Sequence, residues 1–208
     1  MPAEALRSTL SARPDPCGSR PEFRGYLYVT TGLLKAANTG AEVAGVMAHE
    51  LAHISAYHGV QNMETYMVAE SIGSLLGDED IGSIVSGALQ IGAGLTFDKD
   101  QEREADELGV GYAAAAGYNP WAIVDFFETL QGLEGGEGRD PDPVSAALSG
   151  LGELFSTHPP TEERIENVKA LIQEMDVAAD DPSLAWEPGT NLAAIQAILA
   201  QGRVDPVE

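Results

Sequence analysis

The stretch "GVMAHELAHISAYHG", residues 45–59, decides which fold the sequence predicts. It carries His49 and His53, four residues apart, with Glu50 directly after the first histidine. Because each residue of a helix turns the chain by about 100°, the two histidines lie on one face, about one turn apart. Zinc binds imidazole nitrogen well, and a catalytic zinc has three protein ligands and one position left for water. The stretch therefore predicts a helix that supplies two ligands of a catalytic metal.

Glu50 gives this pattern a chemical meaning. A bound zinc ion lowers the pKa of a water toward neutrality, and a carboxylate beside it can take the proton and pass it to a leaving amine. This is the chemistry of peptide-bond hydrolysis, and the spacing HExxH places both ligands and the base within one helical turn. The alternative is that the pattern arose by chance on an ordinary amphipathic helix.

His58 is the third histidine of the stretch and follows His49 by nine residues. If one helix runs from about Gly40 to His58 and stops at Gly59, the two rings lie about 180° apart around its axis. We therefore expect His58 to point away from the metal, so that a third ligand has to come from elsewhere in the chain.

The segment "DQEREADELG", residues 100–109, offers that third ligand. Glu102 and Asp106 are four residues apart and so share one face of a helix. Glu102 can complete the zinc ligands, and Asp106 can accept the ring N–H of a ligand histidine and orient it. Glu104 lies about 200° from Glu102 around the helix and is expected to face solvent. The alternative is a solvated acidic helix start, which the helix dipole also favours.

The segment "FSTHPPTEERI", residues 155–165, contains the last histidine of the chain. His158 lies in a loop fixed by Pro159 and Pro160, and Arg164 follows at the start of a helix. His158 can act as a fourth, displaceable zinc ligand, or it can donate a hydrogen bond to the oxyanion of a transition state. The alternative is an ordinary surface histidine in a loop.

Composition and charge narrow the class of protein. The chain has 208 residues, which suits a single domain. With 33 acidic and 11 basic residues its net charge is −22, which repels phosphate backbones, so we expect no nucleic-acid partner. Cys17 is the only cysteine, so no intrachain disulfide forms. The first residues lack an apolar signal-peptide core, and read literally they leave the protein in the cytoplasm.

The chain divides into a loose arm over residues 1–24, a metallopeptidase domain over 25–176 and a tail over 177–208 with a short amphipathic helix. Hydrophobic residues make up 44% and aromatic residues 6%, as in a predominantly helical fold. The alternating run at residues 26–31 predicts a short strand. Capping residues predict four helix starts. They are Thr39 with Glu42, Asp98, Asn119 with Pro120, and Thr161.

The segment "IGSIVSGALQIGAGLTF", residues 81–97, has no charged residue. It is short for a membrane span, and its glycines weaken an isolated helix. We expect it to be buried or to line a cleft, and the alternative is peripheral contact with a membrane interface. Further along, residues 132–143 form an acidic linker by composition, and a short helix is expected to end near Phe155.

Four segments, taken in their order along the chain, resemble the zinc metalloendopeptidases that include the CAAX prenyl endopeptidases, the heat-shock protease HtpX and the soluble envelope proteases of the BepA type. They are residues 25–59, the Gly-rich apolar insert 81–97, "DQEREADELGVGYAAAAGYNPWAIVDFFETL" at 100–130 and "LFSTHPPTEERI" at 154–165. HExxH followed by ExxAD and then by STHP is far more specific than HExxH alone. The transmembrane helices of some relatives are missing, which favours the soluble branch.

The resemblance implies a role for each site residue. It implies that one Zn²⁺ per chain is held by His49, His53 and Glu102. It implies that Glu50 acts as the base and that Asp106 is a supporting aspartate, which is sometimes assigned as a proton donor. It also implies that the loop histidine His158 can occupy the open zinc position and that Arg164 is a basic residue near the cleft.

The fold implied by the resemblance is α+β, predominantly helical and gluzincin-like, with a small sheet beside the active-site helix. A peptide substrate would extend that sheet along the edge formed by Tyr26, Leu27, Tyr28 and Val29. The substrates would be unfolded or misfolded polypeptides in protein quality control, and soluble relatives work in the bacterial periplasm or envelope. Two alternatives remain: a catalytically silent zinc-binding interaction module, and an enzyme that is latent while His158 blocks the metal.

Overall fold

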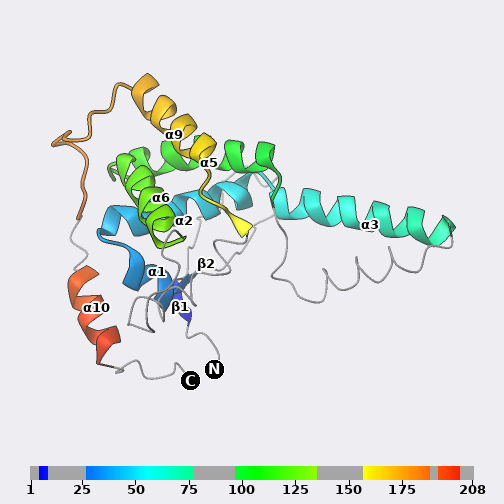
Figure 1. Cartoon of the computed structure of the whole chain (residues 1–208), viewed down its shortest axis with the longest axis horizontal. Coiled ribbons are helices and arrows are strands. Elements are labelled where there is room, and N and C mark those ends of the chain that lie inside the picture. Colours follow the sequence, from blue (N-terminus) through cyan, green and yellow to red (C-terminus); the bar gives the residue numbers. More distant parts are fainter. Residues whose placement is uncertain (1–4, 9–26, 77–96, 135–156, 188–191, 202–208) are drawn as a thin grey trace, which may run out of the picture.

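The computed structural model describes residues 5–8, 27–76, 97–134, 157–187 and 192–201. These residues are mostly helical, as the composition predicts (Figure 1). Tyr26, the apolar segment up to residue 96, the linker beyond residue 134 and the helix expected near Phe155 lie outside the described residues. The elements are β1 (Ala5–Ser8), β2 (Leu27–Thr30), α1 (Thr31–Ala36), α2 (Gly40–Ser55), α3 (His58–Leu76), α5 (Lys99–Ala115), α6 (Trp121–Glu134), α9 (Glu162–Glu174) and α10 (Leu192–Ala200).

The described strands form one antiparallel pair. β1 pairs with β2 so that Ala5 lies opposite Thr30 and Ser8 opposite Leu27. The strand expected at residues 26–31 is therefore present from Leu27 to Thr30, and within the arm predicted for residues 1–24 the structure describes only the four residues of β1. The alternating pattern of β2 was visible in the sequence, whereas its partner has no such pattern, which is why only one of the two strands was predicted.

The helix starts follow the capping residues that the sequence shows. Thr39 accepts a hydrogen bond from the backbone N–H of Glu42 at 3.2 Å, and the hydroxyl of Thr161 caps α9 in the same way. Asp98 and Gln101 form a complete capping box at the start of α5. The reciprocal bond of the capping box is shifted by one residue: the Glu42 carboxylate accepts from the backbone N–H of Asn38 at 2.9 Å and from the hydroxyl of Thr39 at 3.4 Å.

The predicted continuous helix through His58 is interrupted. α2 ends at Ser55, Tyr57 adopts a φ of 60°, and α3 begins at His58. A left-handed residue reverses the direction in which the next side chain points, so the rotation counted from His49 no longer applies to His58. The expectation that His58 points away from the histidine pair is therefore wrong, and its actual neighbours are described with the site.

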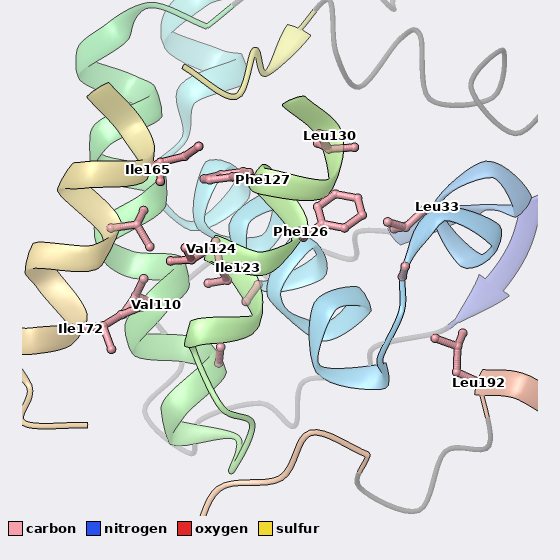
Figure 2. Packing of buried hydrophobic residues seen from close by; sticks show 14 of the residues in the cluster. Leu33, Val110, Ile123, Val124, Phe126, Phe127, Leu130, Ile165, Ile172 and Leu192 are labelled. Carbon is pink, nitrogen blue, oxygen red and sulfur yellow. The ribbon is translucent and has the colours of Figure 1, made fainter. Parts of the chain in front are cut away.

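The core lies between α1, α2, α5, α6, α9 and α10. Figure 2 shows Phe126 and Phe127 of α6 between Leu33 of α1 and Ile165 of α9, and all four side chains are buried. Burial of each such side chain contributes about 1.5–3 kcal/mol. α2 runs through the middle of this body and α3 extends away from it (Figure 1). The core thus holds α2, α5 and α9 against one another, and these helices carry or adjoin the expected site residues.

The C-terminal part packs onto the same body. Leu192 on α10 is buried in the core, and the Gln196 side-chain amide donates to the carbonyls of Leu34 and Ala37, each at 2.9 Å. The backbone N–H of Ala41 at the start of α2 donates to the carbonyl of Trp186. The predicted short amphipathic helix is present and covers α1. None of the helices in the described ranges is both long and apolar enough to cross a membrane.

A glycine sets the distance between α2 and α5. A Cβ added at Gly109 would lie 3.1 Å from the Cα of His49 and 3.2 Å from its backbone N. Real Cβ atoms seldom approach backbone so closely, so α5 can pack this tightly only with glycine at this position. Gly111, on the same helix, has no atom within 4 Å of its added Cβ.

We expect Gly109→Ala to lower the free energy of unfolding by about 1–3 kcal/mol, because the added methyl group forces α5 away from the backbone of α2. Gly111→Ala is the matched control, and it should raise the free energy of unfolding by about 0.5–1 kcal/mol because alanine favours a helix over glycine. Urea denaturation of both variants measures these changes. Shifts of the same sign and size in both variants would contradict the close contact.

Candidate metal centre

Four buried side chains converge between the helices. His49 and His53 come from α2, Glu102 comes from α5, and His158 comes from the loop before α9. One ligand atom from each of them lies within 4.8 Å of all the others. The structure therefore brings together the two histidines of HExxH, the expected third ligand and the loop histidine.

The spacing of these atoms can be compared with that of a zinc site. In a tetrahedral site with metal–ligand distances of about 2.0–2.1 Å, ligand atoms are about 3.3 Å apart. The Nε2 atoms of His49 and His53 are 3.0 Å apart, and Oε1 of Glu102 lies 3.3 Å from Nε2 of His53. Nδ1 of His158 lies 3.4 Å from Nε2 of His49. These separations and the N/O donor set fit zinc.

The hydrogen bonding in and beside the cluster is incomplete. Nδ1 of His49, Oε1 of Glu50 and Oε2 of Glu102 are buried without a well-directed hydrogen bond among the described residues. Each has a polar neighbour, but none of these contacts has hydrogen-bond geometry. Buried polar atoms are nearly always satisfied in proteins, so the incomplete oxygens of Glu50 and Glu102 beside the histidine rings fit a site for a further partner, whereas Nδ1 of His49 faces Asp106.

Electrostatics favour a cation at this point. Burial opposes the charge on Glu102, but hydrogen bonds from the three histidines around it outweigh burial and hold the pKa of its carboxyl far below the usual range. Burial likewise opposes protonation of His49, but Asp106 and Glu102 outweigh it and raise the pKa of His49 to about 9. Burial and the charge of His49 lower the pKa of His53. A divalent cation would replace the proton that the cluster otherwise holds.

Asp106 and Arg164 support the cluster from behind. Oδ1 of Asp106 lies 3.0 Å from Nδ1 of His49, the ring nitrogen on the side away from His53. Arg164 donates through Nε and Nη2 to both oxygens of Asp106, at 2.9 and 2.7 Å, and its Nη1 lies 2.7 Å from Oε2 of Glu102. Burial opposes the charge on Asp106, but Arg164 outweighs it and lowers the pKa of the carboxyl. The arginine thus holds two carboxylates in place around the histidines.

Glu50 lies at the open side of the cluster. Its side chain is 31% exposed, and Oε1 lies 3.4 Å from Nε2 of His158. Glu50, His49 and His158 line a cavity of about 20 Å³. This volume holds about one water-sized group. The remaining wall is mostly apolar and comes from Gly45, Val46, Ile123, Phe126, Phe127, Leu130 and Arg164.

Three residues around the cluster were not identified from the sequence. The ring of Phe97 lies 3.9 Å from that of His53 and stacks on His158 at 5.2 Å, centroid to centroid. His58 is fully buried, and its Nδ1 lies 2.8 Å from Nδ1 of His53. Glu104 is 58% exposed, as expected, but its Oε2 lies 3.3 Å from Nε2 of His58. Phe97 ends an uncharged run and gives no signal of its own, and His58 was misplaced by the assumption of one continuous helix.

The predicted substrate edge is described only in part. Leu27 and Val29 of β2 are half-buried, and Val29 packs against the core. One edge of β2 is covered by β1. The use of the other edge by a peptide remains a prediction.

A buried cluster of three histidines and a glutamate in a helical domain fits a metal-dependent enzyme. A sequence profile described as Peptidase family M48 matches residues 20–172. The chain belongs to this family, as the motifs at residues 49–53, 102–106 and 155–165 predict.

Named relatives agree with this family. The chain is 26% identical over 155 residues to "Metalloprotease YcaL" of Escherichia coli, which covers 70% of this chain and 54% of that protein. It is 31% identical to the "Putative beta-barrel assembly-enhancing protease" of Vibrio cholerae, over 69% of this chain and 30% of that protein. It is also 31% identical to a "Protease HtpX homolog" of Thermococcus sibiricus, over 72% of this chain and 61% of that protein. The chain thus spans between 30% and 61% of the length of these relatives.

Proposed function

We propose that this protein is a zinc-dependent metalloendopeptidase of the HExxH and ExxAD type that hydrolyses peptide bonds in unfolded or misfolded polypeptides. The observation that carries the proposal is the convergence of His49, His53 and Glu102 in a buried cluster with Glu50 at its open side. Membership of the M48 family supports the metal-dependent peptidase chemistry. The names of the relatives, which include an assembly-enhancing protease, support a role in protein quality control.

In this proposal each residue has a defined task. Zinc held by His49, His53 and Glu102 would supply a water of lowered pKa and polarise the peptide carbonyl. Glu50 accepts the proton of the attacking water and delivers it to the leaving amine. Asp106 orients the ring of His49, and Arg164 keeps Asp106 ionised and in place.

The walls of the cavity suggest what the site accepts. Ile123, Phe126, Phe127 and Leu130 surround a small space beside Glu50 and His158. Apolar walls favour an apolar side chain. We therefore assign this cavity to an apolar side chain next to the cleaved bond, with the edge of β2 away from β1 as the strand along which the peptide binds.

The proposed function is tested by metal loading and cleavage on one preparation. Metal-free protein titrated with zinc should bind about one ion per chain, as expected for one set of ligands. Zinc-loaded protein should cleave casein, an unfolded polypeptide, and a chelator should abolish cleavage until zinc is added back. A His49→Ala and His53→Ala double variant should bind no zinc at this site. Zinc binding without any cleavage would instead support a silent interaction module.

A latched enzyme is the second candidate, and it rests on the position of His158. Its Nδ1 lies 2.7 Å from Oε1 of Glu102 and 3.4 Å from Nε2 of His49, so it can complete a set of four protein ligands. Four protein ligands are typical of structural zinc sites, whereas catalytic sites keep one position open. His158 would then have to leave the metal before substrate binds.

For the latched enzyme we expect His158→Ala to raise the rate of casein cleavage at saturating zinc, because one position beside the metal becomes free. Zinc affinity measured on the same variant should fall, since a ligand is lost. A rate that drops to the level of a Glu50→Gln variant at full zinc occupancy would contradict the latch and show that His158 assists catalysis.

A further inference from the structure

His58 is a buried histidine that has no role in the mechanism proposed above. Its side chain is buried, and among the described residues its ring makes two polar contacts: Nδ1 with Nδ1 of His53 at 2.8 Å, and Nε2 with Oε2 of Glu104 at 3.3 Å. Both contacts are within hydrogen-bonding distance. His58 therefore connects a candidate metal ligand to a carboxylate at the surface.

The direction of these hydrogen bonds follows from the ring atom that faces the cluster. Nε2 of His53 lies 3.0 Å from Nε2 of His49 and 3.3 Å from Oε1 of Glu102, so Nε2 is the nitrogen available to a metal. A metal-binding nitrogen carries no proton, so the N–H of neutral His53 is on Nδ1. It then donates to Nδ1 of His58, whose own N–H is left on Nε2 and donates to Glu104. Each donor in this series meets one acceptor, and no ring has to be charged.

The backbone conformation that places His58 beside His53 is strained at Tyr57. Tyr57 adopts the left-handed conformation, with a φ of 60°. This conformation costs a residue with a side chain about 1 kcal/mol or more and persists only where the surroundings impose it. The turn ends α2 and returns His58 to the ring of His53, with the ring centroids 4.9 Å apart. On another side, the ring of Phe97 covers His53 with carbon atoms.

We propose that His58, oriented by Glu104, is a positioning residue that fixes the tautomer and ring orientation of His53 so that Nε2 of His53 binds the metal. This inference rests on the proposed function, because it concerns a ligand of the proposed zinc site. Partners that hold the second nitrogen of a ligand histidine typically change metal affinity or activity by about 10–100-fold when they are removed. Asp106 holds His49 from one side of the site, and His58 would hold His53 from the other.

A pair of variants of similar size tests the proposal. In His58→Asn the side-chain oxygen can take the place of Nδ1 and accept from His53, whereas His58→Leu has no acceptor. Zinc affinity by chelator competition and the visible spectrum of the Co²⁺-loaded protein are the two readouts. We expect His58→Leu to lower zinc affinity about 10–100-fold and alter the Co²⁺ spectrum, and His58→Asn to keep both close to wild type.

Glu104 provides a second pair that leaves the core intact, because its side chain is 58% exposed. Glu104→Ala should lower zinc affinity severalfold, whereas Glu104→Gln keeps an acceptor for His58 and should not. Glu107→Ala, an exposed acid on the same helix, is the control for a change of net charge.

The outcomes separate the two proposals. Wild-type protein that binds no zinc would overturn the proposed function itself. Wild-type protein that binds zinc while His58→Leu and Glu104→Ala bind it equally well, with unchanged Co²⁺ spectra, would overturn only the positioning role. A loss in folded His58→Asn as large as in His58→Leu would also overturn it, since packing rather than the acceptor would then matter.

Discussion

Replacing Glu50 by glutamine is expected to lower the rate of casein cleavage by about 10²–10⁴-fold, the usual contribution of a general base. The amide has nearly the same shape as the carboxylate but cannot take a proton from water. Glu50 does not belong to the four converging ligands, so zinc binding should stay at about one ion per chain. The change therefore separates chemistry from metal binding.

Zinc content and cleavage rate have to be measured on the same preparation of Glu50→Gln. Glu64→Gln is a suitable control, because this glutamate is exposed on α3 and makes the same change of charge. Cleavage by zinc-loaded Glu50→Gln at the wild-type rate would show that Glu50 is not the base. Equal inactivity of wild type and Glu50→Gln would favour the silent interaction module.

Replacing Arg164 by methionine should lower the free energy of unfolding of the metal-free protein by about 3–5 kcal/mol, as expected when one partner of a buried ion pair is removed. Arg164 is buried and contacts both oxygens of Asp106 and one oxygen of Glu102. Without it, the Asp106 carboxylate stays buried with only His49 nearby. Zinc should offset part of the loss, because the ion supplies positive charge beside Glu102.

Urea denaturation with and without zinc measures this effect. Lys169→Met is the matched control, because Lys169 pairs with Glu128 and Glu166 at the surface, where removal of an ion pair changes stability little. Adding Asp106→Asn to Arg164→Met should recover part of the lost stability, since one unpaired charge disappears. Equal losses for Arg164→Met and Lys169→Met would contradict the structural role assigned to Arg164.

Local sequence signals predicted much of this structure. The caps at Thr39, Asp98 and Thr161 are local features, and the structure confirms the helix starts that they indicate. The spacing of HExxH and of Glu102 with Asp106 defines one face of each helix, and the packing of α2 on α5 turns these faces toward each other. The predominantly helical class followed from composition in the same way.

The features that were not predicted depend on tertiary contacts. The turn after α2 is made by a tyrosine in the left-handed region, where glycine is the usual signal, so the sequence gives no sign that the helix ends before His58. β1 lacks an alternating pattern and is defined by pairing with β2. Arg164 was predicted to lie near the cleft, but its double contact with Asp106 and Glu102 depends on how α9 packs on α5.

The positions of the candidate ligands along the chain have a consequence for biosynthesis. His49 and His158 are 109 residues apart, and Glu102 is 56 residues from His158. One ion bound to all of them would close two loops of about 50–60 residues, as disulfides do, and closing each loop is worth up to about 4 kcal/mol in the chain-entropy model. A nascent chain that has not yet presented Glu102 offers only a weak two-histidine site. Under the proposed function, the metal site would therefore form only after the chain has folded through α5.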